Sequence, residues 1–141
     1  MSIRVVRLGT ARAPDEGMRI GTVRRPPRGV PKEEFAIRDF YDVWLPELAP
    51  SQELVRQAQR AETDREWQRF AHAYRREMSR PEARHLIELI AALSRRTDAS
   101  VGCYCEDESR CHRRILRALL EDAGASLAPD PGPSAQRVEK H

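Results

Sequence analysis

The chain has no long apolar run, and this absence argues against a membrane-spanning helix. Its longest apolar stretches, such as HLIELIAAL, are much shorter than the roughly 20 residues needed to cross a bilayer. The N-terminal segment MSIRVVRLGTAR also lacks the apolar core and small-residue cleavage site of a signal peptide. We therefore expect a cytoplasmic protein with no membrane partner.

Lysine is nearly absent, since Lys32 and Lys140 are the only two lysines and arginine supplies almost all of the positive charge. Arginine makes planar, bidentate contacts with carboxylates and phosphates that lysine cannot reproduce. The formal net charge is only +3, which is too small to indicate nucleic-acid binding by itself. No aromatic residues interleave with the basic loop described below, which also argues against a nucleic-acid partner.

Cysteine is scarce too, with three residues in the whole chain, all within 103–111. In a reducing cytoplasm, three closely spaced cysteines do not indicate a structural disulfide framework. They point instead to thiol chemistry, metal binding or simple burial. The sequence leaves these three interpretations open.

Apolar patterning predicts strands at both ends of the chain and helices between them. Strands are expected at 3–9, 18–25 and 99–105, because each is short, apolar or alternating. Strands at both ends with helices between them indicate an α/β fold: a small single-domain sheet of mainly parallel strands flanked by helices, Rossmann-like and three-layered. We expect one domain over 1–124 and a proline-rich, disordered tail over 125–141.

Capping residues set the expected helix boundaries. Ser51 follows Pro50 as a helix N-cap, and Thr63 with Glu66 forms a capping box for the next helix. Ser79, Pro81 and Glu82 open a third helix. Before Ser51, we expect the stretch over 35–51 to hold a short helix and a loop. The last helix is expected to begin with Ser109 as its cap and to end at Gly124.

The segment CYCEDESRCHRR, residues 103–114, joins a predicted strand to a predicted helix. Ligands of open α/β sheets bind where strands end and helices begin, so this cysteine turn is the first candidate site. Strand alternation places Cys103 and Cys105 on one face, with Tyr104 opposite. A thiol near a helix N-terminus is a candidate nucleophile, although the acidic residues at 106–108 oppose a thiolate.

Other interpretations of the cysteine turn remain open. Cys105, Cys111 and His112 are a possible ligand set for a metal or haem, although C-x-C followed by C-H is unusual spacing for zinc. Cys105 and Cys111 also form a candidate redox pair. Buried cysteine is common in cores, and Cys103 fits that description best.

The segment VRRPPRGVPKEE, residues 23–34, is the second candidate site. This arginine loop carries four basic residues on a backbone stiffened by prolines: Arg24, Arg25, Arg28 and Lys32. A rigid loop lowers the ordering cost of holding an anion. The alternative is a solvated basic loop with no ligand.

Four segments together resemble the bacterial "domain of unknown function 488" family, particularly its YeaO-like branch. They are PPRGVPKEEF, WLPELAPSQEL, WQRFAHAYRREM and the C-x5-C-H-R run from Cys105 to Arg113. The resemblance covers roughly 3–124 and implies a compact α/β fold without an established activity. Val23 and Pro26 stand where YeaO-like proteins tend to have an acidic residue and a tryptophan, so no role of those residues carries over.

We predict that the two segments meet at one edge of the sheet and bind a small anionic ligand, with thiol-based chemistry as a possible consequence. The expected ligand-binding residues are Arg24, Arg28, Lys32 and Arg113. The expected catalytic residues are Cys105, Cys111 and His112. A metal- or haem-binding protein is the first alternative and a nucleic-acid-binding protein the second. The cofactor, reaction and oligomeric state do not follow from the sequence.

Overall fold

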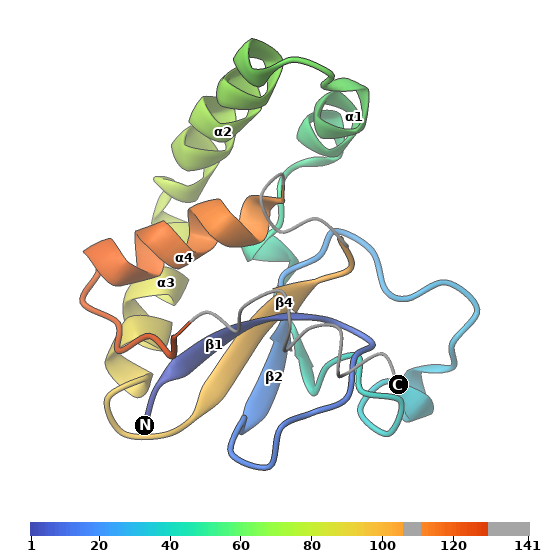
Figure 1. Cartoon of the computed structure of the whole chain (residues 1–141), viewed down its shortest axis with the longest axis vertical. Coiled ribbons are helices and arrows are strands. Elements are labelled where there is room, and N and C mark those ends of the chain that lie inside the picture. The colour runs from blue at the N-terminus through green and yellow to red at the C-terminus, as the bar shows by residue number, and fades with distance from the viewer. Residues whose placement is uncertain (106–110, 130–141) are drawn as a thin grey trace.

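A computed structural model describes residues 1–105 and 111–129, which form one parallel sheet flanked by helices (Figure 1). The sheet has the strand order β1-β4-β2-β3, and every pairing is parallel. Its strands are β1 (Ile3–Arg7), β2 (Met18–Gly21), β3 (Val43–Trp44) and β4 (Ala99–Cys103). This arrangement confirms the predicted α/β fold with a mainly parallel sheet.

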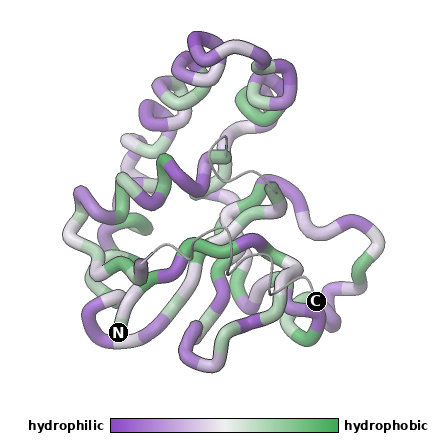
Figure 2. Tube along the Cα trace, in the orientation of Figure 1, coloured by the Kyte–Doolittle hydropathy of each residue, from purple (hydrophilic) through white to green (hydrophobic). Residues whose placement is uncertain are grey.

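The helices lie between β3 and β4 and after β4. They are α1 (Gln52–Arg60), α2 (Asp64–Met78), α3 (Pro81–Leu93) and α4 (His112–Asp122), with short 3-10 helices η1 (Lys32–Glu34) and η2 (Pro46–Leu48). Helices α3 and α4 lie beside the sheet, whereas α1 and α2 form a hairpin that extends away from it (Figure 1). Colouring by hydropathy shows that this hairpin is largely hydrophilic (Figure 2). No helix in the described part of the chain is long and apolar enough to cross a membrane.

The predicted N-caps of α1 and α2 are present. The Ser51 hydroxyl accepts a hydrogen bond from the Leu54 amide, and Thr63 and Glu66 form the reciprocal capping box. Gly124 has φ +91° just after α4, a conformation that disfavours residues with a Cβ atom. Caps of this kind each stabilise a helix by about 1 kcal/mol.

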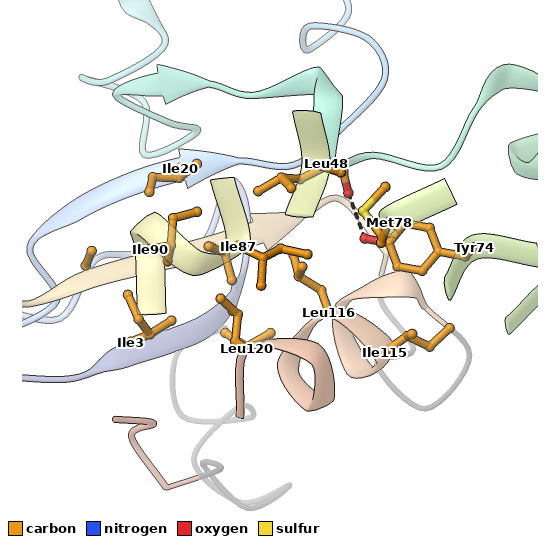
Figure 3. Close-up of a cluster of buried hydrophobic side chains, with 14 of the residues drawn as sticks. Ile3, Ile20, Leu48, Tyr74, Met78, Ile87, Ile90, Ile115, Leu116 and Leu120 are labelled. Atoms are coloured by element: carbon orange, nitrogen blue, oxygen red, sulfur yellow. Dashed lines mark hydrogen bonds between the residues drawn. The ribbon is translucent and has the colours of Figure 1, made fainter. Parts of the chain in front are cut away.

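The main core lies between the sheet and the helices (Figure 3). Alternate strand residues, including Ile3, Ile20 and Val101, pack against apolar residues of α3 and α4. Tyr74 of α2 is fully buried, and its hydroxyl donates a hydrogen bond to the carbonyl of Leu48 at 2.7 Å. This bond joins the helical hairpin to the segment that leads into α1.

Glycine on β4 lets a loop pack closely against the other face of the sheet. A Cβ atom on Gly102 would lie 2.7 Å from the Val6 carbonyl oxygen and 2.8 Å from a methyl carbon of Leu8. The neighbouring Gly21 is covered in the same way by the ring of Tyr41. Connecting loops therefore cover this face, opposite the helical layer.

Several boundaries differ from the sequence prediction. The segment over 35–51 contains strand β3 as well as η2, because two residues after Asp42 pair with β2. Helix α4 begins at His112 with Cys111 as its N-cap, and Ser109, the predicted cap, lies outside the described residues.

Residues shortly after Gly124 hydrogen-bond to the start of β1. The Ile3 amide donates to the Ser126 carbonyl at 2.7 Å, and the Ala128 amide donates to the Ile3 carbonyl at 2.8 Å. Residues 126–128 therefore lie beside Ile3 at the start of β1. The rest of the predicted tail, 130–141, lies outside the described residues.

Candidate functional site

The arginine loop and the cysteine turn meet at the edge of the sheet where β2 and β4 end. A cavity of about 680 Å³ lies between them, lined by both segments and by α1. The Tyr104 hydroxyl donates a hydrogen bond to the Arg25 carbonyl at 3.0 Å and ties the two segments together. Segments separated by about 80 residues in the sequence thus form one site, as two strand ends of a parallel sheet allow.

Most of the predicted site residues line this cavity. Those that do are Arg24, Arg28, Cys105, Cys111 and His112. The other two predicted residues, Lys32 and Arg113, are not among the described residues that line it.

Lys32 and Arg113 lie elsewhere for different reasons. Lys32 is exposed at the start of η1, beyond the cavity. Arg113 is buried in the first turn of α4 and donates a hydrogen bond to the Cys105 carbonyl at 2.8 Å. Its contact is with the backbone that carries the exposed thiol, so Arg113 positions Cys105.

Helix α1 supplies lining residues that the sequence analysis did not identify. Arg56 and Gln59 extend from α1 into the cavity wall. Arg24 explains why α1 lies here: its side chain donates to the carbonyls of Ala49 and Pro50, at 3.2 and 3.1 Å, just before the helix begins. Apolar periodicity predicts the helix itself but carries no signal for its place beside the arginine loop.

Three thiols gather at the floor of the cavity. The sulfur atoms of Cys103 and Cys111 are 2.7 Å apart, and both side chains are at most 2% exposed. Cys105 is exposed and lines the cavity together with the two buried thiols. Tyr104 packs against the ring of Phe40 and also lines the cavity.

The surroundings of the three thiols shift their pKa values in different directions. Burial raises the pKa of Cys103 far above the usual range of a thiol. Hydrogen bonds from Cys103 and Cys111, aided by the charge of Arg113, lower the pKa of Cys105. For Cys111 the hydrogen bond with Cys103 favours the thiolate, but the contact with Cys105 and burial outweigh it and raise the pKa. The exposed Cys105 is therefore the most acidic of the three thiols.

His112 is a buried, neutral base beside Cys111. Its Nε2 lies 2.7 Å from the Thr22 carbonyl oxygen, which can only accept, so Nε2 carries the proton. Nδ1 is therefore an acceptor, and it lies 3.8 Å from the Cys111 sulfur. Burial lowers the pKa of His112 to about 4, which keeps the ring neutral at pH 7.

A metal ion is the other species that this cluster could hold. Ligand atoms of Cys103, Cys111 and His112 all lie within 4.8 Å of one another, a set that replaces Cys105 of the predicted set with Cys103. Two thiolates on one tetrahedral zinc ion are roughly 3.8 Å apart, from Zn–S bonds of about 2.3 Å. The observed 2.7 Å is shorter, so the two sulfurs would have to separate to accept zinc.

Comparison with known proteins gives one match. The family described as "Active DUF488-N3 subclade", DUF488-N3a, matches residues 3–124. No curated protein and no solved structure matches the chain. The matched region contains the arginine loop, α1 and the whole cysteine turn. The match does not distinguish a YeaO-like branch, but it covers most of the chain, and the protein therefore belongs to the DUF488 family.

Proposed function

We propose that this protein binds a small anionic ligand in the cavity between the arginine loop and the cysteine turn, and that Cys105 is the group that reacts with it. The observation that carries the proposal is the shared cavity: Arg24 and Arg28 line the same space as the exposed Cys105. Binding and reactive groups thus lie within reach of one small molecule.

The charge of the cavity wall favours an anion. Four arginines line it, namely Arg24, Arg25, Arg28 and Arg56, and no carboxylate is among the described lining residues. Guanidinium groups bind phosphates and carboxylates through paired hydrogen bonds, each charged bond contributing about 1.5–3 kcal/mol. Two of these arginines, Arg25 and Arg28, are exposed, so their side chains can reach a ligand without leaving the core.

The thiol gives the site its reactivity. Cys105 is at the surface of the cavity, and the contacts that lower its pKa supply a thiolate, which is the nucleophilic form. The thiolate sulfur forms a bond to an electrophilic atom of the ligand, and the leaving group departs with its bonding electron pair. The arginines hold the ligand's charge during this step.

Calorimetric titration with inorganic phosphate and pyrophosphate tests the binding half of this proposal. Arg28→Gln is expected to raise the Kd at least roughly tenfold, because it removes one charged contact. Lys32→Gln is the matched control, since Lys32 is equally basic and lies outside the cavity, and its Kd should change less than about twofold. Equal losses in both variants, or no binding of either anion, would contradict the proposal.

Metal binding is the second candidate, favoured by the proximity of Cys103, Cys111 and His112. It predicts that protein purified without chelators retains about one equivalent of zinc and that Cys111→Ser loses it. Elemental analysis of both proteins decides the matter. Stoichiometric zinc in the wild type would replace the thiol chemistry proposed for this site.

A further inference from the structure

The buried thiols suggest a second chemistry that needs no anionic ligand. We propose that Cys103 and Cys111 form a redox-active dithiol that Cys105 connects to solvent, so that a hydroperoxide oxidises the exposed thiol and a buried Cys103–Cys111 disulfide is the product. The sequence predicts Cys105 and Cys111 as the redox pair. The geometry points to Cys103 as the final partner instead.

The first reason is distance. The Cys103 and Cys111 sulfurs are 2.7 Å apart, and a disulfide bond of about 2.05 Å requires them to approach by roughly 0.7 Å. Cys103 ends β4 and Cys111 caps α4, so the last residue of a central strand and the first turn of a packed helix hold the two sulfurs together. The folded domain therefore presents this pair already aligned.

The second reason is access. Cys103 and Cys111 are 1% and 2% exposed, so an oxidant in solution does not reach them directly. Cys105 is exposed and lines the same cavity as both of them. It is the one thiol of the three that can contact an external molecule and a buried sulfur, and this places it between solvent and the dithiol.

The reaction balances in three steps. The Cys105 sulfur attacks the hydroperoxide, the O–O bond breaks, and the products are Cys105 sulfenic acid and an alcohol, or water when the oxidant is hydrogen peroxide. The Cys111 sulfur then attacks the Cys105 sulfur and displaces the hydroxyl, which leaves as water with the Cys111 proton. Finally Cys103 attacks the Cys111 sulfur, and Cys105 departs as the restored thiol with the proton of Cys103. One peroxide has been reduced and two buried thiols oxidised.

His112 is placed to assist the second step. Its Nε2–H is fixed on the Thr22 carbonyl, and its Nδ1 acceptor lies 3.8 Å from the Cys111 sulfur. Nδ1 can take the Cys111 proton as the sulfur attacks and return it to the departing hydroxyl. His112 thereby positions and moves a proton without contacting the peroxide.

The test is to map the disulfide. The reduced full-length protein is treated with one equivalent of hydrogen peroxide, its remaining thiols are blocked with N-ethylmaleimide, and its intact mass is measured. After the mass of the added N-ethylmaleimide is subtracted, one disulfide is expected to lower the mass of the protein by about 2 Da. Chymotryptic cleavage after Tyr104 and tryptic cleavage after Arg110 separate the three cysteines into different peptides. The expected product links the peptide of Cys103 to the peptide of Cys111.

Two variants test the order of events. Cys105→Ser changes an exposed residue and is expected to slow disulfide formation at least roughly tenfold, because the buried pair loses its contact with the oxidant. Cys103→Ala is expected to stop at a Cys105–Cys111 disulfide. If this core variant does not fold, as judged by circular dichroism, the wild-type map and Cys105→Ser still decide the question.

Three results would overturn the inference. They are a final wild-type disulfide that includes Cys105, oxidation of Cys105→Ser at the wild-type rate, and accumulation of sulfinic acid with no disulfide. Because no anion takes part, the outcome of phosphate titration does not affect this test. Either proposal can fail while the other stands.

Discussion

Two buried polar clusters flank the centre of the sheet, and they differ in how their polar atoms are used. Glu16 and Arg19 are 2% and 1% exposed and form an ion pair at 2.6 Å, completed by the Ser100 hydroxyl at 2.9 Å from the same carboxylate. Arg19 also donates to the carbonyls of Thr10 and Asp39. Every one of these contacts consumes a donor or acceptor inside the fold.

The thiol cluster is buried to a similar degree but lies beside a cavity. Cys103, Cys111 and His112 contact one another and the Thr22 carbonyl, and the cavity wall lies directly over them. Their groups are neutral or weakly polar, so burial costs less than it does for Glu16 and Arg19. A saturated ion pair holds structure in place, whereas thiols beside a cavity retain the capacity to react.

The largest expected effect tests the structural cluster. Arg19→Met leaves the Glu16 carboxylate buried without its cation, and we expect the free energy of unfolding to fall by about 3–5 kcal/mol. Arg4→Met is the matched control, because Arg4 pairs with the exposed Asp15 at 2.7 Å, and such pairs contribute about 1 kcal/mol or less. Urea unfolding of the two variants measures the difference. Similar losses would remove the distinction between the two clusters.

A second prediction concerns the pH dependence of stability. The folded-state pKa of His112 is about 4, below the ordinary histidine value of about 6.5. As the pH falls, the unfolded chain therefore binds a proton at this histidine before the folded chain does. The contribution of His112 to the free energy of unfolding is complete above pH 6.5 and falls as the pH drops toward 4. The contribution of this residue reaches at most about 1.4 kcal/mol per pH unit.

His112→Gln tests that slope because glutamine keeps an N–H donor and does not titrate. Unfolding midpoints in urea, measured between pH 4 and 7, should vary less with pH in the variant than in the wild type. The depressed pKa of Glu16 adds a separate acid loss at lower pH, which both proteins share. Parallel curves throughout the range would contradict a buried neutral His112.

A smaller effect is expected at Cys105. Arg113→Met removes one of the charges that favour the Cys105 thiolate and should raise the pKa of Cys105 slightly. The ratio of its alkylation rate by iodoacetamide at pH 6.5 to the rate at pH 9 should therefore fall, by about twofold at most, because Arg113 is the smallest of the causes that lower this pKa. Arg114→Met is the control, since Arg114 is the next residue on α4 and is exposed. Equal pH profiles for the two variants would show that Arg113 does not tune the thiol.

Much of the fold follows from local patterns. The Thr63 capping box, the glycine stop at Gly124 and the alternation of strand residues all act over a few positions, and the structure has them as predicted. The meeting of the two loops also follows, because β2 and β4 are parallel and their carboxyl ends share one edge. Local chemistry and sheet topology were sufficient for these features.

The features that the sequence does not predict depend on packing between distant segments. Strand alternation pairs Cys103 with Cys105, and only the placement of the start of α4 beside the end of β4 brings Cys111 to Cys103. Arg19 sits in an alternating strand, where nothing in the pattern signals that the Glu16 loop buries it. The cavity side of α1, with Arg56, is likewise set by Arg24 across 25 or more residues.

One measurement addresses the central claim, that guanidinium groups and a reactive thiol serve the same ligand. Alkylation of Cys105 by iodoacetamide is followed at pH 7.5 with increasing pyrophosphate, in the wild type and in Arg28→Gln. The account predicts saturable protection in the wild type and, in the variant, protection only at concentrations at least roughly tenfold higher. Alkylation that is indifferent to pyrophosphate, or equally protected in both proteins, would contradict it.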